Sequence, residues 1–133
     1  MANYNDLKRT LGDALRQFSD EINVFDFFPK SVVPPAAVIQ PAVPTVNFIQ
    51  AEQSRTAEWR FTVMLIVGQV NEEAAQTKIG DLISPGSDLI EALNVVGEDT
   101  GFLRVKVTDA SVSEVQVGTT TYAYARLSVN VIA

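Results

Sequence analysis

Two long segments alternate apolar and polar side chains with a period of two, and this pattern constrains the fold more than any other feature. One face of Glu58–Gly68 carries large apolar side chains, namely Trp59, Phe61, Val63, Leu65 and Val67. One face of Tyr122–Ile132 carries Ala123, Ala125, Leu127, Val129 and Val131. Period-two alternation is typical of strands that bury one face. Both segments therefore predict strands that need a covering layer.

Apolar residues at helical spacing predict the helices that form this covering layer. The first apolar stripe consists of Leu7, Leu11, Ala14, Leu15 and Phe18, and Asn5 or Asp6 is a suitable cap for its helix. A second helix is expected after Asn71, with Glu72 and Glu73 in its first turn and a buried stripe of Ala75, Ile79, Leu82 and Ile83. A third, shorter helix is expected over Ser87–Val95. Small side chains at Ala123 and Ala125 would let a helix approach the sheet closely.

Prolines limit what the segment between the first helix and the first long strand can form. Asn23–Phe28 is short and aromatic and predicts a strand, and five of the six prolines follow between positions 29 and 44. Proline has no N–H to donate, so this region suits loops, turns or edge strands. Ala36–Gln40 and Thr45–Gln50 are two short candidates for edge pairing.

The C-terminal third predicts a long β-hairpin. Phe102–Val117 and the strand from Tyr122 flank a turn at Gly118-Thr119. The first arm would span ~50 Å if fully extended, against a diameter of ~36 Å for a domain of this size. Either the strand breaks at Asp109–Ser111, or the tip projects as an arm that contacts a neighbour. The candidate arm residues are Val115, Val117, Thr120 and Tyr122.

The order of these elements predicts an α+β fold. We expect an antiparallel or mixed sheet with helices packed on one face and a long C-terminal hairpin. The 133 residues suit a single domain, residues 1–133, and 47% of them are hydrophobic, as in globular chains.

Residue types that the chain lacks exclude several kinds of chemistry. There is no cysteine and no histidine, so thiol nucleophiles, zinc–thiolate centres and histidine bases are impossible. Asp99-Thr100-Gly101 matches the aspartic-protease triplet, but Gly97 and Glu98 stand where apolar strand residues are needed. We therefore expect a turn there, no enzyme activity, no cofactor and no metal.

Neither a secretory signal nor a membrane span is expected. The N-terminal residues contain no apolar core of the signal-peptide type. The longest apolar run, Val63–Gly68, is far shorter than the ~20 residues that a spanning helix needs.

The charge of the chain is concentrated in one stretch. Residues 71–99 carry seven acidic groups against Lys78 alone, which accounts for the whole net charge of −6. These acidic groups belong to the predicted helices, whereas Arg60, Arg104, Lys106 and Arg126 fall on the other face of the sheet, among Phe102, Tyr122 and Tyr124. The pattern predicts an acidic side and a basic, aromatic side. Such a basic, aromatic sheet face also suits a small monomeric domain that binds single-stranded nucleic acid or a peptide.

Several segments, taken in order, carry a resemblance to a known family. They are LKRTLGDALRQF, NVFDFFPKSVVPPAAVI, WRFTVMLIVGQ, EEAAQTKIGDLISPGSDLIEALN and, at the C-terminus, RVKVTDA followed by TYAYARLSVNV. Together they resemble the tail-terminator proteins of long-tailed bacteriophages, especially siphophages of actinobacterial hosts.

The resemblance implies a structural protein of the virion, assembled in the host cytoplasm and without catalytic residues. It implies a hexameric ring on the head-proximal end of the tail tube, which stops tube polymerisation and joins the tail to the head. The implied partners are further copies of the chain, the major tail-tube protein and the head–tail connector or neck protein. DNA would pass through the lumen without specific binding, and no membrane is involved.

A ring needs two different patches that meet between neighbours. We therefore expect the acidic residues of one subunit to face the basic residues of the next. The candidates are Glu72, Glu73, Asp81 and Glu91 on the acidic side, and Arg104, Lys106 and Arg126 on the basic side. A competing assignment places the acidic residues on the lumen, where they would repel passing DNA.

Overall fold

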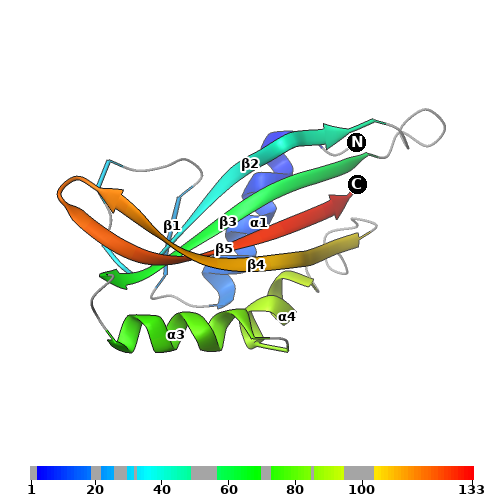
Figure 1. Cartoon of the computed structure of the whole chain (residues 1–133). Coiled ribbons are helices and arrows are strands. Elements are labelled where there is room, and N and C mark those ends of the chain that lie inside the picture. The colour runs from blue at the N-terminus through cyan, green and yellow to red at the C-terminus, as the bar shows by residue number, and fades with distance from the viewer. Residues whose placement is uncertain are drawn as a thin grey trace.

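A mixed five-stranded sheet covered by helices forms the body of the protein (Figure 1). The computed structural model describes residues 3–18, 22–25, 30–31, 33–48, 57–69, 73–84, 86–94 and 104–133, with the backbone alone at position 104. The helices in this part are α1 (Tyr4–Phe18), α3 (Glu73–Ile83) and α4 (Asp88–Asn94). The strands are β1 (Asn23–Phe25), β2 (Ala36–Asn47), β3 (Glu58–Gln69), β4 (Arg104–Val117) and β5 (Thr120–Ile132). The expected α+β class is confirmed.

Strands β3 and β5 form the centre of the sheet, which has the order β1-β2-β3-β5-β4. They pair antiparallel along the whole of β3, from Glu58 opposite Ile132 to Gln69 opposite Tyr122. The predicted faces are confirmed, because the inner side chains of both strands belong to the main core. Its buried members from β3 and β5 are Phe61, Val63, Leu65, Ala123, Ala125, Leu127, Val129 and Val131.

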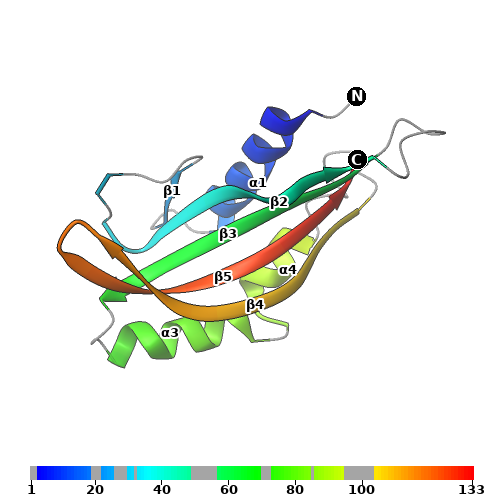
Figure 2. The ribbon, with the colours of Figure 1, turned by 45° about the horizontal axis from the view of Figure 1, so that its top comes forward.

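All three described helices contribute to this same core. Leu7, Leu11 and Leu15 of α1 are fully buried, as are Leu89 and Leu93 of α4, and Ile79 of α3 is buried beside them. Figure 1 and Figure 2 show α1 behind the strands, with α3 and α4 towards the β4 side. The helices therefore cover one face of the sheet, as predicted, and leave the other, which we call the far face.

The start of α1 differs from the sequence prediction. The cap is Asn3, not Asn5 or Asp6: its Oδ1 accepts from the Asp6 backbone N–H at 3.0 Å, and its Nδ2 donates to the Asp6 carboxylate at 2.7 Å. This reciprocal pair satisfies an N–H that the first turn leaves free. The helix therefore begins at Tyr4, before both predicted caps.

The other two helices follow the sequence closely. Ala75 and Ile79 of α3 are buried over β3 and β5, where Ala123 and Ala125 are buried beneath them. Ser87 caps α4, because its Oγ accepts from the Ile90 backbone N–H at 3.3 Å. The predicted cap Asn71 lies outside the described residues.

Strand β2 corrects the expectation of two short edge segments. Ala36–Asn47 is one strand. It has a bulge between Pro41 and Val46, and Pro44 lies within this bulge. Only Ala36–Val38 also pair with β1, in parallel, which makes the sheet mixed. Beyond Val38 no described residue pairs with the outer side of β2, and edge strands of this kind accept prolines. Residues 26–28 and 49–50, included in the two predictions, lie outside the described part.

The hairpin of β4 and β5 is continuous. Of the two alternatives, a break at Asp109–Ser111 does not occur, and a bulge between Val107 and Asp109 bends the strand instead. Gly118 has a φ of +66° in the turn, a value that suits glycine. A bulge adds local twist and curvature, so a long strand fits a small domain by bending rather than by ending.

Helix α4 closes part of the outer edge of β4. The Asn94 side-chain Oδ1 accepts from the Val107 backbone N–H at 3.0 Å. The Val107 N–H is therefore already hydrogen-bonded to the helical layer and is not available to pair with a further strand.

Shortening a buried side chain at the centre of α1 tests the assignment of the main core. Leu11→Ala should lower the free energy of unfolding by about 2–5 kcal/mol, because Leu11 is fully buried and its removal leaves a cavity. Urea unfolding measures this change. Val43→Ala, at a side chain that is 98% exposed, should change stability by less than about 0.5 kcal/mol. Equal losses in both variants would contradict the assigned core.

Removing the Asn94 acceptor tests the closed part of the β4 edge. Asn94→Ala should cost about 1 kcal/mol and speed hydrogen exchange at the Val107 amide, because this N–H loses its acceptor. Asn94→Asp keeps an oxygen acceptor and should retain protection. Unchanged exchange at Val107 in the alanine variant would show that another group holds this amide.

Candidate subunit interface

The exposed surface of α3 and α4 is acidic, as the sequence predicted. Glu73 and Asp81 of α3 and Asp88 and Glu91 of α4 are all exposed, and we call these four the acidic helical surface. None forms an ion pair with any residue that the structure describes. Asp88 is an addition to the predicted set, and Glu72, which the prediction included, lies outside the described residues. These carboxylates are therefore available to a partner.

The basic residues lie on the far face, on the opposite side of the sheet from the helices. Arg60 and Lys106 both stand beside Asn130, from β3 and β4 respectively, and Arg126 lies further along β5, between Met64 and Ser111. We call Arg60, Lys106 and Arg126 the basic cluster. The Arg104 side chain is not described, although its backbone pairs beside Ile132.

Two carboxylates reduce the positive charge of this cluster. Glu58 accepts from Arg60 Nε at 2.7 Å, and Asp109 accepts from the Ser128 hydroxyl at 2.8 Å. Lys106 and Arg126 are exposed and pair with no described carboxylate. These two side chains are thus the cations of the cluster that remain open to an acidic partner.

The aromatic half of the far face differs from the prediction. Tyr122 and Tyr124 are only half-exposed, because they pack with Val115 and Val117 of the hairpin on a second apolar cluster. The buried members of this cluster are Ala36, Val38, Met64 and Ile66. The bulges in β3 and β4 curl the hairpin towards this face, so the tyrosines are not an open stacking platform.

The candidate arm is therefore anchored on one side. Val115, Val117, Thr120 and Tyr122 are half-buried, whereas Gln116, Gly118 and Thr119 are exposed. The curled tip of the hairpin is visible in Figure 1 and Figure 2. Contact of this tip with a neighbour stays a prediction.

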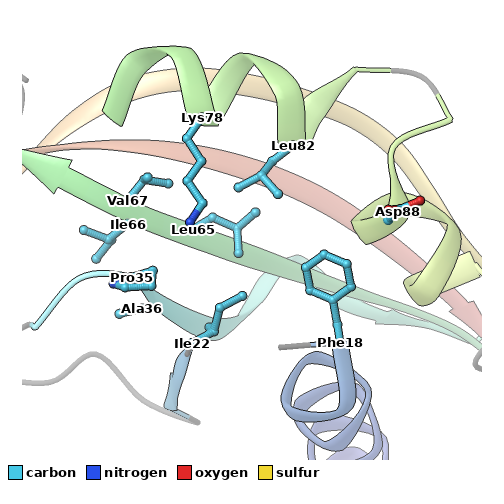
Figure 3. Close-up of a pocket in the computed structure, with 10 residues that line it drawn as sticks. All are labelled: Phe18, Ile22, Pro35, Ala36, Leu65, Ile66, Val67, Lys78, Leu82 and Asp88. Carbon is cyan, nitrogen blue, oxygen red and sulfur yellow. The ribbon is translucent and has the colours of Figure 1, made fainter. Parts of the chain in front are cut away.

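A cavity that the sequence did not reveal lies between α1, α3 and the sheet. It has a volume of about 400 Å³ and a largely apolar lining (Figure 3), comprising Phe18, Ile22, Pro35, Ala36, Leu65, Ile66, Val67 and Leu82 with Lys78 and Asp88. Figure 3 shows Lys78 reaching from α3 towards β3. Five separate elements contribute to it, together with Ile22 before β1 and Pro35 before β2. No local sequence pattern could therefore predict it.

Among the residues that the structure describes, no three metal-ligating side chains lie close enough together to hold an ion. The triplet Asp99-Thr100-Gly101 lies outside the described residues. Among the helices described here, none combines the length and apolar character that crossing a membrane requires.

Comparison with known proteins adds no assignment: no family model matches the chain, and no curated protein is significantly similar to it.

Shortening a buried side chain of the second apolar cluster tests whether this cluster anchors the hairpin tip. Met64→Ala should speed hydrogen exchange at the amides of Val115 and Tyr122 more than at those of α1, because Met64 lies under the tip and not in the main core. Ile79→Ala is the matched control, since it loosens the helical side and should have the reverse effect. Uniform acceleration by Met64→Ala would show that the tip does not open as a local unit.

Proposed function

We propose that this protein is a structural component of a bacteriophage tail, similar to the tail terminators. Copies would form a ring, a hexamer by the resemblance, at the head-proximal end of the tail tube. The ring would stop tube polymerisation and join the tube to the connector or neck protein of the head. The proposal involves no catalysis and no cofactor.

The observation that supports ring formation is the two-sided charge of the subunit. The acidic helical surface and the basic cluster lie on opposite sides of the domain, separated by the helical layer and the sheet. A closed ring requires a heterologous interface in which two different patches meet. Opposite potentials on the two patches would set the register between neighbours and speed their association.

In the favoured arrangement, Glu73, Asp81 or Glu91 of one subunit faces Lys106 or Arg126 of the next. Each of these groups is exposed and pairs with no described residue of its own chain. Pairing between neighbours would give each one a partner without breaking an existing ion pair. The competing arrangement places the acidic helical surface on the lumen, where it would repel the DNA backbone.

The alternative function is a small monomeric domain that binds single-stranded nucleic acid or a peptide through the far face. Base stacking on such a platform needs exposed aromatic rings. Tyr122 and Tyr124 are half-buried beside the hairpin, and Glu58 and Asp109 lie among the basic residues. These features favour the ring over the nucleic-acid platform.

The direct experiment is to add the purified protein to polymerising tail-tube protein and to measure tube lengths by negative-stain electron microscopy. A tail terminator should stop growth and leave a ring at one end of each tube. Tubes of unchanged length without end rings, together with salt-sensitive binding of an oligonucleotide by the monomer, would favour the alternative.

Charge reversal separates the two ring arrangements. Lys106→Glu combined with Arg126→Glu should abolish ring assembly at low salt, because each interface would then oppose like charges. Adding Glu73→Lys and Asp81→Lys to that variant should restore assembly.

The matched control is Lys30→Glu, which reverses an exposed cation outside the basic cluster and should leave rings intact. Normal assembly of the Lys106/Arg126 variant at low salt would refute pairing between neighbours and favour the lumen arrangement.

A further inference from the structure

The outer edge of β4 is open over the half of the strand nearest the turn. Residues from Thr108 to Glu114 are all exposed, and no described residue pairs with their outer side. Across the two-residue turn, Val117 and Thr120 face each other as a hydrogen-bonded pair. Because such pairs alternate along an antiparallel ladder, the N–H and C=O groups of Ala110, Val112 and Glu114 point outward. We call Ala110–Glu114 the open edge.

Two other described stretches of the sheet edge are protected. Beyond its contact with β1, β2 carries Pro41, Pro44 and a bulge, and prolines and bulges are devices that prevent edge pairing. At the other end of β4, the outward N–H of Val107 already donates a hydrogen bond to the Asn94 side chain. The open edge has neither a proline nor a capping side chain, and its centre, Val112, is an apolar side chain that is 55% exposed.

We propose that the open edge pairs antiparallel with the open edge of a second copy, about a two-fold axis through Val112. In this register the two Val112 side chains face each other, and Ala110 of each copy faces Glu114 of the other. Asp109 faces Val115, so no like charges stand opposite. The outward backbone groups of both copies bond to each other, and the two sheets become one.

Neighbouring registers are less favourable. An axis at Ser113 places Val112 opposite Glu114, and an axis at Ser111 separates the two valines. Only the axis at Val112 buries the exposed valine of each copy against its equivalent, a cross-strand contact of the kind that stabilises antiparallel pairs. The proposed occupant is therefore a second copy and not an unrelated strand.

This inference does not rest on the proposed ring. A two-fold contact is isologous, whereas a ring closes through heterologous contacts, so the pairing describes the free protein. It would cover an edge that otherwise recruits strands from other chains. Failure of tube capping would leave the pairing intact, and failure of the pairing would leave tube capping intact.

Cysteine cross-linking tests the register directly, because the chain has no cysteine of its own. Val112→Cys should form a disulfide-linked dimer under mild oxidation, since residues in a hydrogen-bonded pair have Cα atoms ~5.5 Å apart, which is within disulfide range. Ala110→Cys is the matched control. Its equivalents would lie four residues apart along the paired strands and should not cross-link. Equal yields for the two variants, or no dimer from Val112→Cys, would overturn the proposed register.

Sedimentation velocity over a range of concentrations tests the pairing without cross-linking. The parent protein should reach twice the 14.5 kDa mass of one chain. Val112→Lys places two cations on the axis and should weaken self-association at least about tenfold. Val43→Lys makes the same change at an exposed valine of β2 and should behave as the parent. A parent protein that stays monomeric, or equal weakening by the two variants, would overturn the proposal.

Discussion

The antiparallel pairing of β3 with β5 is the constraint on which the rest of the structure depends. It aligns two rows of inner side chains, from Phe61 to Leu65 and from Ala123 to Val131, into one apolar surface. That surface is too large to leave in water, so α1, α3 and α4 pack on it and their own apolar stripes become fully buried. Helix positions, and with them the acidic helical surface, follow from this one burial requirement.

Bulges then decide where the edges of the sheet and the tip of the hairpin lie. The irregularity between Val107 and Asp109 lets a long strand curve instead of ending, and it directs Val115 and Val117 onto the second apolar cluster. The same curvature converts two tyrosines from a solvated surface into packing residues. A hairpin that is anchored on one side and open along its outer edge suits contacts between chains better than binding of a small ligand.

The proposed function needs a subunit that is rigid and different on its two sides. Rigidity comes from the shared core, and the difference comes from the separation of charge between helices and sheet. The carboxylates of α3 and α4 have no described partner, and the same holds for Lys106 and Arg126. These groups are exposed in the free chain, so pairing with a neighbour would cost them only a modest part of their hydration. Ring assembly by such contacts would therefore depend on salt.

By itself, the sequence determined the elements and their buried faces, because periodicity is local: the alternation of Glu58–Gly68 and the stripe of Leu7, Leu11 and Leu15 both appear as predicted. Asn3 was missed as a cap because Asn5 and Asp6 are also cap-forming residues and lie nearer to the stripe. Only the tertiary structure decided that β2 is continuous, that Tyr122 and Tyr124 are covered, and that a cavity and an open edge exist. Those features depend on which strands become neighbours and on bulges that change register, and both arise from contacts between residues far apart in the chain.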